Sequence, residues 1–369
     1  MTLDRVYDYH ERRGFGRCSL TSHRREVMLR PHSMSLAFRA RIAVLVPCLN
    51  EEAEVASVVH GMREALPGAT VYVYDNGSTD RTVERAKAAG AVVAREALRG
   101  KGNVVRRMFA DIDADVYVLV DGDGTYDARE APVMVERLLD DQLDLVSAVR
   151  ISNQAGAYRA GHRLGNTVIT GVVAKIFGRR VRDVLSGYRV FSRRFVKSFP
   201  LLATGFEIET ELTVHALALR MAMAEVDSAY GERAAGSESK LHTYRDGFRI
   251  LRTILKLAKD ERPLAFFSLI ALALAVLSIG LSIPIFEVYS RTGLVPRFPT
   301  AILSSAIMIL AFLALASGFV LDSVTRGRHE MKRLHYLRED PPARVGAEAA
   351  QASPGSKGKG KTDELGVAR

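Results

Sequence analysis

Short apolar segments that alternate with helical patterns constrain the fold of this chain more than any other feature. The segments are 42–46, 70–74, 91–94, 116–120 and 143–149, and valine recurs in all of them. Strands that are apolar on both faces belong to parallel sheets covered by helices on each side. The sequence therefore predicts a mostly parallel, doubly wound, Rossmann-like α/β sheet.

The stretches between these segments carry helical periodicity. One stripe has the i, i+3, i+4, i+7 spacing of a helix packed on a sheet and ends before Pro67-Gly68; its residues are Val55, Val58, Val59, Met62 and Leu66. Further helices are predicted over about 80–89, over about 102–114 and from Pro132 onward.

Polar residues follow three of the predicted strands. Asn50, Asp75 and Asp121 stand at strand ends, and ligands of doubly wound sheets bind beyond the carboxyl ends of the strands. Asp121 opens the stretch DGDGTYD, in which Asp123 is the second carboxylate of an Asp-x-Asp pair. Two chemistries use such a pair: a phosphatase nucleophile, or a divalent metal held against a nucleotide diphosphate.

The phosphatase alternative rests on residues 121–125, which match the Asp-x-Asp-Gly-Thr string of haloacid-dehalogenase enzymes, with Asp121 as the nucleophile. That string belongs after the first strand, whereas three strand-helix units precede Asp121 here. The metal alternative fits better, because Asp121 and Asp123 offer the oxygen ligands that Mg²⁺ or Mn²⁺ prefers. Gly122 and Gly124 are expected to leave room for the diphosphate.

Two long segments contain no charged residue. Residues 264–286 and 301–321 would, at ~1.5 Å per residue, each cross a hydrocarbon layer roughly 30 Å thick. Lys and Arg cluster outside this pair, and only Arg291 and Arg297 stand between the two segments. The sequence predicts a transmembrane hairpin with both flanks, and the catalytic domain, in the cytoplasm, as in a bacterial inner-membrane protein.

The basic residues also bear on partners. The formal net charge of +10 gathers in the N-terminal forty residues and beside the apolar segments, which favours a membrane surface and predicts no nucleic-acid partner. In 241–262, Lys and Arg recur at helical spacing opposite an apolar stripe, as in an interfacial amphipathic helix; a solvated surface helix is the alternative. Cys18 and Cys48 have no spacing of a disulfide framework or zinc site.

A family resemblance extends these inferences. Residues 42–127 resemble a family-two glycosyltransferase of the GT-A fold, and the motifs that carry the likeness are VPCLNEE, YDNGSTDRT, GKGNVVRR and VDGDGTYD. Residues 145–241 are similar to the polyprenyl-phosphate branch of that family through SAVR, HRLGNT, RDVLSGYRVFSRR, GFEIETEL and RAAGSESKL. The resemblance implies transfer of a sugar from a UDP- or GDP-sugar to a polyprenyl phosphate, with inversion and with Mg²⁺ or Mn²⁺.

The resemblance also implies roles for individual residues. Asp121 and Asp123 would bind the metal, with Asp123 and Asp183 as catalytic residues and Asp183 near the sugar or acceptor oxygen. The nucleotide-sugar would contact Pro47, Asn50, Glu51, Asp75, Asn76, Lys101 and Asp121. The acceptor phosphate would contact Arg150, Arg163, Arg233 and Lys240. For the arginines the alternative is solvation at the surface or pairing with Glu207, Glu209 or Glu211.

Two departures and two rival functions accompany the resemblance. Asn76 replaces a frequent second Asp, and Thr125 stands where mannose synthases commonly have Gln, so the donor sugar and the third metal ligand stay open. A processive polysaccharide synthase would carry a Gln-x-x-Arg-Trp signature, and the chain contains no Trp. A catalytically dead membrane scaffold is the other rival, against which the retained Asp121 and Asp123 argue.

The expected organisation has five parts. A flexible N-terminal extension (1–40), for which Met28 and Met34 are alternative starts, precedes the catalytic domain (41–240). The interfacial helix (241–262), the membrane hairpin with its basic flank (263–340) and a disordered tail (341–369) follow. Self-association through the membrane helices is a further expectation from related enzymes.

Overall fold

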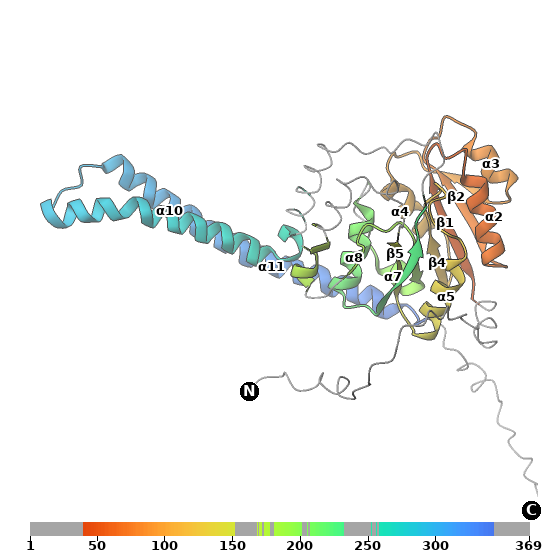
Figure 1. Cartoon of the computed structure of the whole chain (residues 1–369). Coiled ribbons are helices and arrows are strands. Elements are labelled where there is room, and N and C mark those ends of the chain that lie inside the picture. The colour runs from red at the N-terminus through yellow and green to blue at the C-terminus, as the bar shows by residue number, and fades with distance from the viewer. Residues whose placement is uncertain are drawn as a thin grey trace, which may run out of the picture.

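A mixed sheet with a parallel half lies at the centre of the α/β domain (Figure 1). The computed structural model describes residues 40–151, 168, 170–171, 173–177, 181–200, 205, 207–231, 252, 256 and 258–342. Within these residues the sheet has seven strands in the order β3-β2-β1-β4-β6-β5-β7. The strands are β1 (Ile42–Cys48), β2 (Thr70–Asp75), β3 (Val92–Arg95), β4 (Val116–Leu119), β5 (Leu145–Ile151), β6 (Arg189–Ser192) and β7 (Met223–Ala229).

Strand direction confirms the predicted mostly parallel, doubly wound sheet. β1 pairs in parallel with β2 and β4, β2 with β3, and β5 with β7. β6 lies between β4 and β5 and is antiparallel to both. The sequence analysis did not predict β6 or β7. Because β6 is reversed, its amino-terminal end lies at the edge where its neighbours have their carboxyl ends.

Helices cover both faces of the sheet. One face carries α2 (Val55–Ala65), α3 (Thr82–Ala88) and α5 (Glu130–Asp140), and the other carries α4 (Lys101–Asp111), α7 (Arg193–Ser198) and α8 (Ile208–Ala218). The predicted helix start at Pro132 was wrong by two residues. The helix begins at Glu130 because a turn precedes it, in which the Glu130 amide donates to the Asp127 carbonyl at 3.2 Å.

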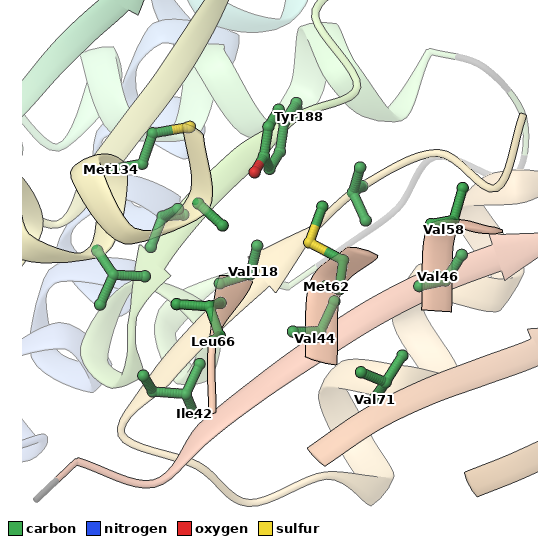
Figure 2. Close-up of a cluster of buried hydrophobic side chains, with 14 of the residues drawn as sticks. Ile42, Val44, Val46, Val58, Met62, Leu66, Val71, Val118, Met134 and Tyr188 are labelled. Carbon is green, nitrogen blue, oxygen red and sulfur yellow. The ribbon is translucent and has the colours of Figure 1, made fainter. Parts of the chain in front are cut away.

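The core on the α2 side follows from the predicted stripe (Figure 2). Val58 and Met62 of α2, with Leu66 directly after the helix, pack with Val44 and Val46 of β1, and all five side chains are buried. Each such buried side chain contributes about 1.5–3 kcal/mol relative to an exposed position. This packing holds α2 against the parallel half of the sheet.

Two long helices form the C-terminal hairpin, which projects away from the α/β domain (Figure 1). α10 (Pro263–Thr292) and α11 (Phe298–Arg338) are both long and apolar enough to cross a membrane. Both extend beyond the charge-free segments from which they were predicted. Small residues recur every seven positions along the buried side of α11, and these are Ser304, Ala311, Gly318 and Thr325.

The small residues let the two helices approach closely. Ser278 of α10 donates its hydroxyl to the Ser304 carbonyl of α11 at 2.7 Å, and a Cβ added at Gly318 would lie 3.0 Å from the Phe267 Cβ. Close helix packing in a membrane depends on such positions. Residues 1–39, most of 241–257 and 343–369 lie outside the described residues, so the predictions for these segments stay predictions.

Candidate active site

Three strand ends bring polar residues to one edge of the sheet. The register pairs Cys48 of β1 with Asp75 of β2, and Leu45 of β1 with Leu119 of β4. The loops that follow these strands therefore leave the sheet side by side, and they carry Asn50, Asp75 and Asp121. The predicted clustering at the carboxyl edge is observed.

Asn50 and Asp75 bind the loop between β2 and α3. The Asp75 carboxylate accepts from the amides of Gly77 at 3.0 Å and Ser78 at 2.9 Å. Asn50 accepts from the Thr79 amide at 2.8 Å and adopts a positive φ of 52°. Residues with short polar side chains adopt such turns most readily. These contacts order the loop beside which a nucleotide is predicted to bind.

Asn76 ties this loop to the start of α4. Its side-chain amide donates to the carbonyls of Glu96 at 3.1 Å and Leu98 at 2.8 Å, and its oxygen accepts from the Gly100 amide at 2.7 Å. An Asp here would lack the two donors. The departure from the family pattern thus has a structural role, while nucleotide contact by Asn76 stays a prediction.

Two further predicted nucleotide contacts lie at the end of β1. Pro47 is the penultimate residue of β1 and pairs with Tyr74 of β2. The Glu51 amide donates to the Thr82 hydroxyl at 2.9 Å, and the Glu51 carbonyl accepts from the Val55 amide where α2 begins. Both residues therefore occupy the edge that the prediction assigned to the nucleotide.

A buried ammonium group bridges two carboxylates beside the Asp-x-Asp pair. The Lys101 Nζ lies 2.6 Å from Asp121 Oδ1 and 2.5 Å from Glu209 Oε1. Only 12% of the Lys101 side chain and 8% of the Glu209 side chain are exposed. Burial opposes the charged lysine, but the two carboxylates outweigh it and raise the pKa of Lys101. The sequence analysis predicted Lys101 but not its contact with Glu209 of α8.

Asp123 is buried next to Asp121 in a tight loop. Its Oδ1 accepts from the Thr125 hydroxyl at 2.6 Å and from the Thr125 amide at 3.2 Å. A Cβ at Gly122 would lie 2.6 Å from Cys48 Sγ, and one at Gly124 would lie 2.8 Å from a Glu54 carboxylate oxygen; that the two glycines also leave room for a diphosphate stays a prediction. The glycines make room for the protein's own side chains.

The loop before β6 completes the surroundings of Asp121. Leu119 pairs with Arg189 across the antiparallel strands, which brings Gly187 opposite Asp121. A Cβ at Gly187 would lie 2.2 Å from Asp121 Oδ2, and the Gly187 amide donates to the Tyr126 hydroxyl at 2.9 Å. Since β6 was not predicted, this contact was not predicted either.

Arg189 fixes the shape of that loop. Its guanidinium is wholly buried and donates to the carbonyls of Ser186 at 2.9 Å and Val184 at 2.6 Å, and to the Thr213 hydroxyl at 2.9 Å. Buried cations require such complete pairing. The resemblance motif contained Arg189 without distinguishing it from the neighbouring arginines.

Arg150 and Asp183 form a buried pair near this loop. Arg150 donates through Nε at 2.7 Å and through Nη2 at 2.9 Å to the two Asp183 oxygens. Burial alone would raise the pKa of Asp183, but the hydrogen bonds and charge of Arg150 outweigh it and lower that pKa. The Arg150 guanidinium also lies 5.5 Å from the centre of the Tyr230 ring. A glutamate of 207–211 was the alternative partner expected for Arg150, and its pair with Asp183 was not predicted.

The donor set fits a divalent cation that arrives together with a diphosphate. Within the part of the chain that the structure describes, no group of three His, Cys, Asp or Glu side chains could hold a metal ion. Asp121 and Asp123 therefore supply at most two carboxylates. Mg²⁺ sites in nucleotide enzymes use one or two carboxylates, with substrate phosphate oxygens and water as the other ligands. Arg163, Arg233 and Lys240 lie outside the described residues, and their roles stay predictions.

These features define a class of enzyme. A doubly wound sheet with an Asp-x-Asp strand end, acidic and amide residues on neighbouring strand ends and a lysine beside the first aspartate is a GT-A glycosyltransferase domain. The chain belongs to glycosyl transferase family 2, whose family model matches residues 43–199. This membership decides against the phosphatase alternative, and the retained Asp121 and Asp123 argue against a catalytically dead scaffold.

Relatives from other organisms agree with this family. The glycosyltransferase AglJ of Haloferax volcanii is 32% identical over 299 residues, which are 80% of this chain and 98% of that protein. A dolichyl-phosphate hexose transferase of the same organism is 30% identical over 222 residues, which are 60% of this chain and 95% of that protein. An uncharacterized protein of Shigella flexneri is 60% identical over 156 residues, or 42% of this chain and 96% of that protein.

Solved structures match the α/β domain. Glucosyl-3-phosphoglycerate synthase from Mycobacterium tuberculosis, in complex with Mn²⁺, UDP and phosphoglyceric acid, superposes with a TM-score of 0.51 at 26% identity. The match covers 62% of this chain and 80% of that one. The same enzyme with Mg²⁺ and UDP superposes with a TM-score of 0.51 at 25% identity, covering 62% and 81%.

Proposed function

We propose that this enzyme transfers a hexose or uronic acid from a UDP- or GDP-sugar to a polyprenyl phosphate at the cytoplasmic face of a membrane, with inversion at the anomeric carbon. One observation carries the proposal. Asp121 pairs with Lys101, which also pairs with Glu209, and it lies against the Gly187 loop; the same chain has a C-terminal hairpin apolar enough to enter a bilayer.

The nucleotide-sugar is assigned to the side of Asp121 that carries Lys101. Asp75 and Asn50 order the loop against which the base and ribose would rest, and the Lys101 ammonium would face the diphosphate. Mg²⁺ or Mn²⁺ held by Asp121 and Asp123 would supply charge neutralisation of the leaving diphosphate. Crystals of the Mycobacterium tuberculosis relative that contain Mn²⁺ or Mg²⁺ with UDP support the use of a divalent metal together with a nucleotide.

The acceptor phosphate is assigned to the side that carries Arg150. Asp183 and Tyr230 orient the Arg150 guanidinium, and a guanidinium is a permanent cation whose planar donors match phosphate oxygens. The named activity of the Haloferax volcanii dolichyl-phosphate hexose transferase supports a lipid phosphate as the acceptor.

The transfer step requires no protein base. A phosphate oxygen forms the new bond to the anomeric carbon while the bond to the diphosphate oxygen breaks and its electron pair leaves with the diphosphate. A phosphate monoester has a second pKa near 6, so the nucleophile is largely deprotonated at neutral pH. Asp183, with a lowered pKa and a bidentate arginine partner, is a poor proton acceptor. We therefore infer that Asp183 positions Arg150.

The experiment incubates membranes containing the protein with labelled UDP- and GDP-sugars and polyprenyl phosphate, and extracts the lipid phase. Label is expected in the lipid phase with one donor. Asp123→Asn is expected to lower this transfer at least a hundredfold without unfolding, because the metal loses one of two carboxylates. Labelled lipid at the wild-type rate from Asp123→Asn would contradict the metal role. A folded wild-type enzyme that labels no lipid with any donor would overturn the proposed acceptor.

A further inference from the structure

The last turns of α11 return from the hairpin to the α/β domain. Figure 1 shows the end of α11 beside α7, on the domain side of the hairpin. The charge-free stretch ends at Leu321, and the 15 residues to Tyr336 add roughly 22 Å of helix at 1.5 Å per residue. This extension of α11 would therefore lie outside the hydrocarbon layer of a bilayer that the charge-free segment spans.

Tyr336 inserts into a buried polar cluster of that domain. Its hydroxyl donates to Asp144 Oδ2 at 3.0 Å, and its ring lies 4.7 Å from the Arg194 guanidinium carbon. Asp144 is wholly buried and also accepts from the Ser192 hydroxyl at 2.9 Å and from Arg194 Nε at 2.5 Å. The ring of Tyr336 packs against the core cluster that contains α4, α7 and α8.

An ion pair extends this contact. Glu339, directly after α11, accepts from Arg193 Nε at 3.0 Å, and Arg193 also pairs with Asp113. Asp144 precedes β5, and Arg193 and Arg194 begin α7 after β6. We name Tyr336, Glu339, Asp144, Arg193 and Arg194 the α11 anchor. The anchor lies at the amino-terminal edge of β5, whereas Asp121 lies at the opposite, carboxyl edge of the parallel strands.

The other end of the extension is tied to the start of α10. The Asp260 carbonyl accepts from the Thr325 hydroxyl at 3.2 Å and from Arg328 at 3.0 Å, and His329 contacts Glu261 at 3.0 Å. The extension is thus held at both ends, by the hairpin and by the catalytic domain. A continuous helix held in this way transmits the orientation of the hairpin to the sheet.

We propose that Tyr336 is a positioning residue: through the α11 anchor it fixes the orientation of the catalytic domain relative to the bilayer, so that a membrane-embedded acceptor reaches the site. The inference rests on the proposed function. It implies that the anchor matters for an acceptor confined to the membrane and has little effect on an acceptor that diffuses freely in water. Tyr336 touches no substrate in this proposal.

The test compares two acceptors in the full-length enzyme reconstituted in liposomes. Tyr336→Phe keeps the ring on Arg194 and removes the bond to a buried carboxylate, and it is expected to lower kcat/KM for long-chain polyprenyl phosphate in the bilayer about tenfold. A short-chain, water-soluble prenyl phosphate is expected to be used within about twofold of the wild-type rate. Tyr289→Phe makes the same chemical change at an exposed position of α10 and is expected to change neither.

Two activity outcomes would overturn the inference. A Tyr336→Phe enzyme that uses both acceptors at wild-type rates excludes the positioning role. Equal losses with both acceptors mean general damage to the catalytic domain. If the wild type uses neither acceptor, the proposed function fails. The claim that Tyr336 fixes the orientation of the catalytic domain is then still tested by a distance measurement between the domain and the hairpin.

The distance measurement uses spin labels at Val133→Cys on α5 and Leu294→Cys between the helices, in a Cys18→Ser background. Both labelled positions are exposed, and the remaining Cys48 is buried. A narrow distance distribution is expected for the wild-type anchor, and a distribution about twice as broad is expected for Tyr336→Ala, since loss of the contact releases the domain. An unchanged distance distribution in Tyr336→Ala would overturn the claim that the α11 anchor fixes the orientation of the catalytic domain.

Discussion

At the scale of single residues, the sequence predicted the aspartates of the site but not their partners. Asp121 and Asp123 form a local string that follows a strand, so their position could be predicted. Glu209 lies 108 positions from Lys101 and Asp183 lies 33 positions from Arg150. Such pairs depend on how the sheet is assembled. The signal available in advance was that, at helical spacing, Glu209 of GFEIETEL lies next to Ile208 and three residues before Leu212, so it falls near the apolar side of a helix, where an unpaired carboxylate is costly.

The Lys101 bridge predicts an effect of Glu209 on metal binding. In Glu209→Gln, Lys101 keeps a single full counter-charge and competes more strongly for Asp121. The metal concentration that gives half-maximal transfer is expected to rise about three- to tenfold, measured by titrating Mg²⁺ at saturating nucleotide-sugar. Glu207→Gln is the control, because it makes the same chemical change at an exposed residue two positions before Glu209. An unchanged half-saturation value in Glu209→Gln would contradict this prediction.

The Arg150–Asp183 pair predicts a separation of the two substrates. Asp183→Asn keeps the size of the side chain but removes the charge that orients the Arg150 guanidinium. The KM for the acceptor phosphate is expected to rise about tenfold or more, because one partner of a buried charge pair is lost, while the KM for the donor stays within a factor of about two. Steady-state kinetics with each substrate varied in turn provide the measurement. A larger effect on the donor than on the acceptor would refute the assignment.

At the scale of elements, the strands with continuous apolar runs were predictable and the other two were not. β6 is the four-residue segment RVFS, which begins with Arg189 and is followed by Arg193, and β7 is MAEVDSA, which contains Glu225 and Asp227. Neither has the apolar run of a buried parallel strand. The reversed direction of β6 is a property of the assembled sheet. Sequence patterns could therefore predict neither this direction nor the position of Gly187 against Asp121.

The close approach of β6 predicts that Gly187 tolerates no side chain. In Gly187→Ala the new Cβ would meet the Asp121 carboxylate at 2.2 Å, so Asp121 must move. Transfer is expected to fall about a hundredfold, as is usual when a site is displaced by about 1 Å, with a smaller loss of thermal stability. Gly231→Ala is the control, since its Cβ would meet its nearest neighbour at 3.8 Å. If Gly187→Ala transfers sugar at the same rate as Gly231→Ala, the loop before β6 can move to accommodate a side chain, and the prediction is wrong.

At the scale of the whole molecule, the order of a sheet domain followed by a membrane hairpin was predictable from composition. The charge-free segments 264–286 and 301–321 fall inside α10 and α11. The contact of α11 with α7 was not predictable, because Tyr336 and Glu339 stand in an otherwise ordinary basic flank. Only their position opposite Asp144 and Arg193 gives them a role.

A buried histidine predicts how the folded molecule responds to acid. His215 of α8 is buried against Phe195 and Phe199, and its Nε2 lies 3.2 Å from the Ser198 hydroxyl. Burial lowers the pKa of His215 to about 3. In the unfolded chain the histidine pKa is near 6.5, so below that pH the unfolded chain binds a proton that the folded chain does not bind. The contribution of neutral His215 to the free energy of unfolding is therefore fully present above pH 6.5 and is lost as the pH falls toward 3.

The expected loss from His215 is about 2 kcal/mol between pH 7 and pH 5. Thermal unfolding in detergent at these two values is expected to show a smaller acid-induced drop in Tm for His215→Gln than for the wild type. The exposed His60→Gln serves as the control. Equal drops in all three proteins would assign the acid sensitivity to other groups.

The unbroken course of α11 from the hairpin to Tyr336 also restricts how this protein can vary in length. Each residue turns an α-helix by about 100°, so a single insertion between Asp322 and Tyr336 would carry the catalytic domain a quarter-turn around the hairpin axis. A two-turn insertion of seven residues would restore the facing of the two parts but lift the domain by roughly 10 Å. Insertions are therefore far better accommodated in the loop at Gly293 than anywhere between Asp322 and Tyr336 of α11.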